Sequence, residues 1–333
     1  MKVEELSTVL DTPRGPLRAV DGISFELRKG ECFALVGESG CGKSMTALSL
    51  MRLLPEAGHI AGGRVSLDGV DLLRLPEAAM RAVRGRRVAM IFQEPSTALN
   101  AVLTVGRQIT EVIERHTPEV SSRREKALEL LAAVGIPDPE RRFDQYPFEL
   151  SGGLKQRVMI AGALAVDPEV LIADEPTTAL DVTIQAQILD LLARLQAERG
   201  MALLLITHDL GVVAQMADRV AVMYAGRIVE DGPVDSFFAD PKHPYTRGLM
   251  ASIPGGAPGA RLRAIQGTVP PLGALPPGCS FTPRCPNRFE PCPRAHPGVT
   301  DFGNGQTVKC YLHGPAVEPE VLPPAQAVAA DSH

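Results

Sequence analysis

Short continuous runs of apolar residues recur along this chain, and each is followed by a loop and a more helical stretch. Four such runs are Glu31–Val36, Arg87–Phe92, Val170–Ala173 and Ala202–Ile206. Continuous rather than alternating apolar sequence is typical of strands that are buried on both faces of a parallel sheet. The pattern therefore predicts an α/β fold with a largely parallel central sheet.

Helical periodicity fills much of the sequence between these runs. It predicts helices at Lys43–Leu54, Ser122–Val134, Gly153–Ala165 and Thr183–Arg199. Because residues from about 95 to 165 are mainly helical in pattern, we expect them to form an α-helical subdomain. The helix at Thr183–Arg199 has an apolar face made of Ile184, Ile188, Leu191, Leu192 and Leu195.

Two hairpin signals predict antiparallel structure as well. Val65–Val70 contains Asp68-Gly69, a favoured two-residue turn, and Val220–Glu230 turns at Ala225-Gly226. Together with the N-terminal residues, these hairpins predict an antiparallel sheet that flanks the parallel one.

The character of the sequence changes towards its end. From about Pro254 it becomes rich in Pro and Gly and weakly periodic, and four of the six cysteines fall between Cys279 and Cys310. We therefore predict one domain over residues 1–235, a second over 236–314, and a disordered tail over 315–333.

Charge and apolar length exclude some classes of protein. A formal net charge of −5 provides no general basic field, so the composition does not favour a nucleic-acid-binding protein. The N-terminus lacks the pattern of a secretory signal, and runs such as Ala202–Ile206 are too short to cross a bilayer. We expect a cytoplasmic protein that would reach a membrane only through partners.

A phosphate-binding pattern follows the first continuous run. The sequence fits the pattern G-x-x-x-x-G-K-[ST] between a predicted strand and a predicted helix. The alternative, an ordinary glycine-rich turn with a surface lysine, does not explain why the pattern occurs in this strand–loop–helix context. Such a loop directs backbone N–H groups at a polyphosphate, its Lys reaches the β- and γ-phosphates, and its last hydroxyl coordinates Mg²⁺. We interpret the cysteine in it as a small residue chosen for size. The loop comprises Gly37, Glu38, Ser39, Gly40, Cys41, Gly42, Lys43 and Ser44.

Polar side chains end three further predicted strands. Asp174 is placed to hold Mg²⁺, and Glu175, one residue on, to polarise the water that attacks the γ-phosphate. His208 and Gln93 end their strands in the same way, and Gln93 can orient a water or a Mg²⁺ ligand. Since ligands gather at the carboxyl ends of parallel strands, we expect all four at one site.

The stretch Leu150–Gln156 reads Leu-Ser-Gly-Gly-Leu-Lys-Gln and provides a second anion cradle at a helix start. A capped helix would explain the serine but not two consecutive glycines, which weaken a helix. With the phosphate loop, Gln93, Asp174-Glu175, Thr178–Asp181 and His208, it resembles the ABC ATPase family from about residue 3 to 235. The resemblance implies a RecA-like P-loop core with a flanking antiparallel β subdomain and an α-helical subdomain.

The resemblance also implies how the site is completed. Two subunits face each other head to tail, with each ATP between the P-loop of one and the signature residues Ser151, Gly152, Gly153 and Gln156 of the other. Asp181 crosses the interface, and His208 contacts the γ-phosphate. The aromatic residue on which the adenine usually stacks is replaced by Leu10, or by Val9, so an aliphatic side chain is expected to pack on the base.

A closer resemblance is to the D-type ATPase subunits of oligopeptide and dipeptide importers. It is carried by Gln93–Asn100, Gln156–Ala161, Asp174–Gln187, His243–Thr246 and the cysteine-bearing tail, with Glu94 where the family usually has Asp. It implies a paralogous ATPase partner (a homodimer being possible), two transmembrane permease subunits, an indirect link to a substrate-binding protein, and a place on the cytoplasmic face of the membrane. The alternative is a non-transport ABC ATPase of the DNA-repair or translation type, which usually carries two cassettes, coiled-coil insertions or basic arms.

Four cysteines in the tail form a candidate metal site: Cys279, Cys285, Cys292 and Cys310. Their number matches the ligands of a [4Fe–4S] cluster, which the tails of the related importers also suggest. The absence of a C-x-x-C knuckle argues against ordinary structural zinc, but Zn²⁺ and free thiols remain alternatives. Because no motif links these cysteines to the phosphate site, we expect them to be independent of ATP binding.

Overall fold

The computed structural model describes residues 1–252 and 265–314, so the tail predicted to be disordered lies outside the described residues. The strands are β1 (Lys2–Thr12), β2 (Gly15–Glu26), β3 (Cys32–Val36), β4 (Gly58–Leu67), β5 (Val70–Asp71), β6 (Val88–Ile91), β7 (Val170–Asp174), β8 (Ala202–Thr207), β9 (Arg219–Tyr224), β10 (Arg227–Pro233), β11 (Thr300–Asp301) and β12 (Thr307–Val308). The α-helices are α1 (Lys43–Met51), α2 (Glu77–Val83), α3 (Pro95–Ala98), α4 (Val105–His116), α5 (Arg123–Ala133), α6 (Pro139–Phe143), α7 (Gly152–Ala163), α8 (Val182–Arg199), α9 (Leu210–Met216), α10 (Val234–Ala239) and α11 (Pro244–Ala251). Short 3₁₀ turns are η1 (Leu72–Arg74), η2 (Pro147–Glu149), η3 (Leu272–Ala274) and η4 (Thr282–Arg284).

An eight-stranded sheet forms the centre of the fold, in the order β11-β12-β10-β9-β3-β8-β7-β6. From β9 to β6, all neighbouring strands run parallel. The predicted parallel strands are confirmed, because the four continuous apolar runs became β3, β6, β7 and β8. Every residue of these four strands is buried, as their unbroken apolar sequence requires.

A four-stranded antiparallel sheet, β2-β1-β4-β5, lies beside the central one. The turn at Asp68-Gly69 is confirmed, since Leu67 pairs with Val70 and both turn residues have positive φ, 49° and 82°. The assignment of Val220–Glu230 to this flanking sheet is wrong. Its hairpin forms, but β9 pairs in parallel with β3 inside the central sheet because Val220–Tyr224 is buried throughout.

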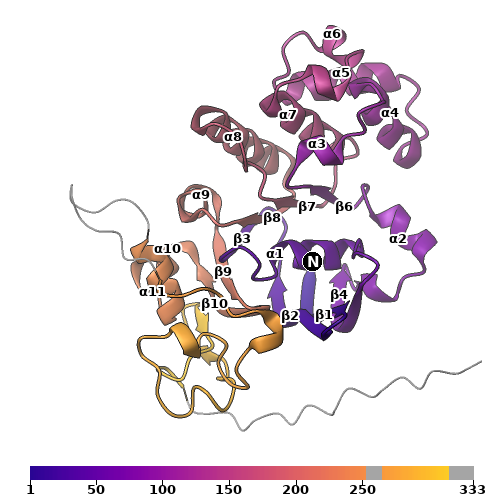
Figure 1. Ribbon diagram of the computed structural model, residues 1–333. Helices are drawn as coiled ribbons and strands as arrows, with labels where there is room; N and C mark the ends of the chain where they lie inside the picture. The colour runs from indigo at the N-terminus through magenta and orange to yellow at the C-terminus, as the bar shows by residue number, and fades with distance from the viewer. Residues whose placement is uncertain (253–264, 315–333) are drawn as a thin grey trace, which may run out of the picture.

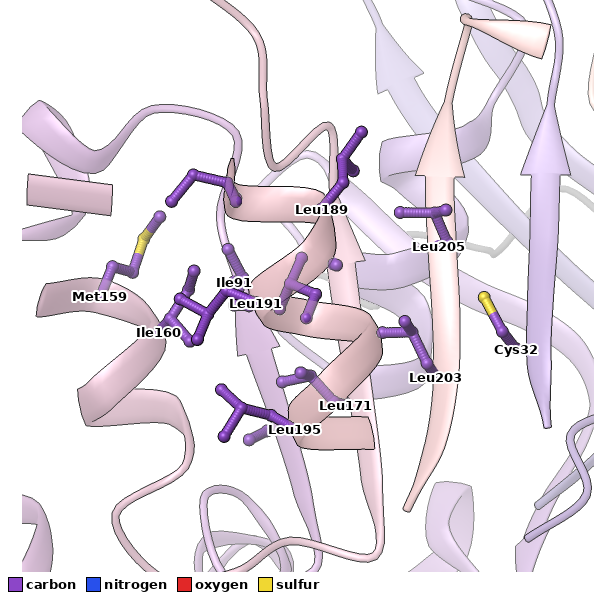
Figure 2. Packing of buried hydrophobic residues seen from close by; sticks show 14 of the residues in the cluster. Cys32, Ile91, Met159, Ile160, Leu171, Leu189, Leu191, Leu195, Leu203 and Leu205 are labelled. Carbon is purple, nitrogen blue, oxygen red and sulfur yellow. The ribbon is translucent and has the colours of Figure 1, made fainter. Parts of the chain in front are cut away.

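Apolar layers cover both faces of the central sheet. One face packs under α1 and the flanking sheet, and the other under α7, α8 and α9. Figure 2 shows the second layer, where Leu191 and Leu195 of α8 lie over Leu171 of β7 and Leu203 of β8. The predicted apolar face of α8 is buried except for Ile184, which is half-buried beside Gly153.

The helices α3 to α7 gather at one end of the molecule, between β6 and β7 in the chain (Figure 1). Residues 236–252 and 265–314 lie at the opposite end, yet they share the central sheet, because β12 pairs with β10. Glu230 of β10, only 1% exposed, accepts hydrogen bonds from the backbone N–H groups of Lys242 and His243 and from Nε2 of Gln306. This buried carboxylate joins three segments of the chain, so the C-terminal region is firmly attached to the rest.

Candidate functional site

The phosphate loop turns between β3 and α1 as predicted. Gly42 has a φ of 110°, and a Cβ there would lie 2.4 Å from the carbonyl oxygen of Ala19, so only glycine fits. Lys43 is 4% exposed, and its Nζ donates to the carbonyl oxygens of Gly37 (2.8 Å) and Glu38 (3.1 Å). The lysine therefore lies along the inside of the loop, with its ammonium group held by two loop carbonyls.

Cys41 packs against the backbone of this loop. It is fully buried, and burial raises the pKa of its thiol, which keeps it protonated. A Cβ on Gly37 would lie 2.7 Å from its Sγ, so the loop and the cysteine fit closely together. This environment agrees with the interpretation of Cys41 as a residue chosen for its size.

The predicted Mg²⁺ ligands Ser44 and Asp174 are adjacent. The Oγ atom of Ser44 donates to Oδ1 of Asp174 across 3.1 Å. Burial raises the pKa of Asp174, and the hydrogen bond from Ser44 opposes this shift. One hydroxyl and one carboxylate match the way in which Mg²⁺ is usually held, with few protein ligands and the rest from phosphates and water.

Glu175 lies at the centre of a polar cluster. Its Oε2 accepts hydrogen bonds from Nε2 of Gln93 (3.2 Å) and Oγ1 of Thr178 (2.8 Å), and its Oε1 lies 3.4 Å from Nδ1 of His208. The structure thus brings together all three residues to which we assign catalytic roles. Thr178, which served only as a family marker in the sequence, orients the same carboxylate.

The backbone of Glu175 is in an uncommon conformation. Its φ is 47°, which is unusual for a residue with a side chain, and its N–H donates to the carbonyl of Ile206 in β8 at 2.9 Å. Such conformations persist where the surroundings fix them, and they are concentrated at functional sites. Here the turn directs the carboxylate towards the ends of the neighbouring strands.

A cavity of about 390 Å³ opens between the phosphate loop and this cluster. Sequence reasoning foresaw most of its lining but not Leu210 and Leu249, which come from α9 and α11. No local signal marks these leucines, because apolar residues on helices are ordinarily core residues. The lining consists of Val36, Gly37, Glu38, Ser39, Gln93, Glu175, His208, Leu210 and Leu249.

Leu10 is not among the lining residues of that cavity. It lies on β1 opposite Leu17 and Gly58, where a Cβ on Gly58 would be 3.2 Å from its Cδ2. Its contact with an adenine ring stays a prediction.

The signature glycines line a second, separate cavity of about 510 Å³. Ser151, Gly152 and Gly153 stand at the start of α7, and Asp181 caps α8 by accepting the N–H of Ile184 at 2.9 Å. Gln156 is not brought to this cavity. It is 2% exposed, and within residues 1–252 and 265–314 its Nε2 has no hydrogen-bond partner.

The four cysteines of the tail line one small cavity together with His243 and Phe281. All four are free thiols, and burial raises the pKa of Cys279, of Cys285 and, to about 11, of Cys310. In the described part of the chain, no group of three or more His, Cys, Asp or Glu side chains is placed to hold a metal ion. The structure therefore does not bear out the expected [4Fe–4S] cluster or zinc ion.

The structure shows a contact between the cysteine region and the phosphate site that no sequence motif indicated. Nη1 of Arg284, the residue before Cys285, lies 3.0 and 3.1 Å from the two carboxylate oxygens of Glu38 in the phosphate loop. Sequence reasoning missed this contact because the two residues are 246 positions apart.

No helix within the described residues is both long and apolar enough to cross a bilayer.

Comparisons with known proteins agree with this geometry. Residues 20–178 match the ABC transporter family, and residues 229–292 match the C-terminal region of oligopeptide/dipeptide transporters. The chain is 50% identical to the dipeptide transport ATP-binding protein DppD of Bacillus subtilis over 97% of both chains. It is 51% identical to a probable peptide ABC transporter ATP-binding protein of Sinorhizobium fredii over 93% of this chain and 94% of the relative.

Solved structures share the fold. The dimeric ATP-binding cassette MJ0796 bound to ADP and Pi has a TM-score of 0.63 and 27% identity, and the match covers 70% of this chain and 98% of that one. The protein cbiO1 of Clostridium perfringens, part of an ABC transporter complex, gives 0.60 and 30%, with 72% and 90% covered. With its P-loop, Glu175 cluster and separate signature cavity, the chain belongs to the ABC transporter family, as an ATPase of the dipeptide and oligopeptide transport ATP-binding proteins.

Proposed function

We propose that this chain supplies the energy for import of oligopeptides or dipeptides, hydrolysing ATP in a head-to-tail pair with a paralogous ATPase. The observation that carries the proposal is that the P-loop cavity and the signature cavity have no lining residue in common. One chain alone therefore presents two half-sites. A second ATPase subunit would join each P-loop to a signature motif.

The residues divide the chemistry between them. Ser44 and Asp174 would hold Mg²⁺, which supplies charge neutralisation at the β- and γ-phosphates. Glu175 polarises the attacking water, and Gln93 and Thr178 fix one oxygen of its carboxylate. His208, 62% exposed, is free to turn towards the γ-phosphate from the same strand edge.

ATP binding shifts the equilibrium between the open and the closed pair of subunits. It contacts both half-sites only when the two subunits close, so it favours the closed pair, and hydrolysis removes that preference. The same-fold cassette MJ0796 is dimeric, which supports the pairing of two such subunits.

A groove beside the helical subdomain provides a surface for a permease subunit. It has a volume of about 380 Å³, is lined mainly by apolar residues, and lies between β6, α3, α4 and α7. Phe92 and Leu99 line it, and Val102, 79% exposed, lies in the loop between α3 and α4. An apolar groove of this kind fits a short amphipathic helix. We infer that one of two membrane permeases places such a helix here, on the cytoplasmic face.

We also retain the [4Fe–4S] cluster as a proposal. Four cysteines on one cavity support it, although their sulfurs are not grouped for one ion. These four cysteines would hold such a cluster as thiolates, four being the number of ligands that it requires. Bound there, it would tie together a segment with few core residues. Iron, sulfide and zinc analysis of anaerobically purified protein tests this proposal, and protein without iron would overturn it.

The peptide class rests on the relatives, whose names describe dipeptide, oligopeptide or peptide transport. No observation favours the alternative of a DNA-repair or translation ATPase, and residues 229–292 match a transporter-specific region.

The head-to-tail arrangement is tested with Ser151→Arg in the assembled transporter. A bulky cation would obstruct the glycine cradle that serves the partner's P-loop. Photolabelling with an ATP analogue should then label this chain normally and the partner weakly. Loss of label from this chain instead would contradict the arrangement. Lys155→Arg, which lies on the same helix outside the signature cavity, serves as the control.

A further inference from the structure

The C-terminal region reaches into the phosphate loop through a single arginine. Nη1 of Arg284 contacts both carboxylate oxygens of Glu38, at 3.0 and 3.1 Å. The other donors of the guanidinium bind the carbonyl oxygens of Gln266 (3.1 Å) and Gly267 (3.2 Å). The side chain of Arg284 is only 5% exposed. All three of its nitrogens are thus engaged, and its position is fixed from both sides.

Glu38 is held from three directions. Its N–H donates to Oη of Tyr245 at 2.9 Å, and its carbonyl accepts from Nζ of Lys43 at 3.1 Å. Tyr245 is itself fully buried against Tyr224 and Phe281. One residue of the phosphate loop therefore has its N–H and its carboxylate bound by the C-terminal region, and its carbonyl bound by the phosphate-binding lysine.

The charge of Glu38 matters because of its location. Glu38 lines the cavity that would receive the polyphosphate, and its side chain is 29% exposed. A carboxylate close to a bound polyanion opposes its binding, the more so where little water screens the two charges. The guanidinium of Arg284 neutralises this carboxylate and restrains the loop at the same time.

We propose that Arg284 is a positioning residue for ATP, which sets nucleotide affinity by neutralising and orienting Glu38. Arg284 itself does not line the nucleotide cavity, so it acts through Glu38. The proposal rests on the binding of ATP at the P-loop. If Arg284 acts in this way, the affinity for ATP depends on the conformation of the segment between Cys279 and Cys285. By thermodynamic linkage, ATP binding in turn stabilises the conformation of that segment in which Arg284 holds Glu38.

The test measures the Kd for MgATP on the purified full-length chain by titration calorimetry. Arg284→Ala should raise the Kd about tenfold, because the carboxylate of Glu38 is then an unpaired negative charge beside the polyphosphate. Adding Glu38→Gln should restore the Kd to within about threefold of the wild-type value, because the unpaired carboxylate is then gone. Arg284→Lys, which keeps the charge, should fall between the wild type and Arg284→Ala. Arg294→Ala is the control, since Arg294 is an exposed arginine of the same region.

Two results would overturn the proposal: an unchanged Kd in Arg284→Ala, or a double variant as weak as Arg284→Ala. A purely structural role predicts the second, since removing a charge from Glu38 would not repair the C-terminal region. If Arg284→Ala does not fold, the two single variants Arg284→Lys and Glu38→Gln still test the proposal. Arg284→Lys should weaken ATP binding, and Glu38→Gln should tighten it. A wild-type chain that binds no ATP would instead contradict the proposed function.

Discussion

Nδ1 of His208 lies 3.4 Å from Oε1 of Glu175, although the two residues follow different strands, β8 and β7. The parallel register that pairs Asp174 with Ile206 brings them together. Since Gln93 and Thr178 bind the other carboxylate oxygen, Glu175 is oriented from both sides. The arrangement suits a group that must hold a water in one direction.

The first prediction concerns His208. His208→Ala should lower the rate of ATP hydrolysis about 100-fold and leave the Kd for ATP within about threefold, because it removes a contact made near the transferred phosphate. The rate of phosphate release at saturating ATP measures the effect. His59→Ala, on the flanking sheet, should change neither quantity, and a normal rate in His208→Ala would exclude the assigned role.

Asp174→Asn should abolish stimulation by Mg²⁺. The amide keeps the shape of the side chain but loses the charge that pairs with the cation, so hydrolysis should fall by about 100-fold or more. A titration of Mg²⁺ at fixed ATP measures this effect. Asp190→Asn on the exposed face of α8 is the matched control. Retained Mg²⁺ stimulation would place the metal on another residue.

Gly42→Ala should disrupt the phosphate loop. Strain at a φ of 110° and the approach to the carbonyl of Ala19 should cost about 1–3 kcal/mol of stability. Nucleotide binding should be lost as well, because the loop must shift to make room for the methyl group. Thermal unfolding and ATP titration check both effects. Gly62→Ala, where nothing lies within 4 Å of the added Cβ, should behave as wild type.

Leu99→Asp or Val102→Asp should uncouple transport from hydrolysis. A charge in or beside the apolar groove opposes docking of a permease helix but lies outside the ATP cavity. Reconstituted transporter should lose substrate-stimulated ATPase activity and transport, with basal hydrolysis unchanged. Val299→Asp, the same change at an exposed valine, should have no effect. Normal transport in the first two variants would move the coupling surface elsewhere.

Much of this fold and site follows from local sequence signals. The four buried strands could be predicted from the sequence because a strand that is covered on both faces must be continuously apolar. The polar residues of the site could be predicted because each stands at or just after the end of such a strand, and parallel strands end at one edge of the sheet. These residues are Gln93, Asp174, Glu175 and His208. Thus Glu175 and His208 could be expected to lie together before their contact was known.

The features that could not be predicted from the sequence depend on contacts between segments that are far apart in the chain. The placement of β9 depends on which neighbour covers it, and a short apolar strand after a helix does not specify that neighbour. The same holds for Arg284 and Glu38, whose pairing arises from the docking of the C-terminal region on the phosphate loop. Gln156 was assigned to the signature cavity from its place in the motif, but helix α7 turns it into the interior.

The most direct test of the ATPase mechanism is Glu175→Gln, measured for hydrolysis and ATP binding on the same preparation. The amide removes the base but leaves Lys43, Ser44 and Asp174 in place, so hydrolysis should fall about 100-fold to 10,000-fold. The Kd for ATP should stay within about threefold, and an ATP-bound closed pair should accumulate with the partner subunit. Glu198→Gln, an exposed position on α8, controls for the substitution itself. Hydrolysis by Glu175→Gln at a rate near that of the wild type would contradict the account.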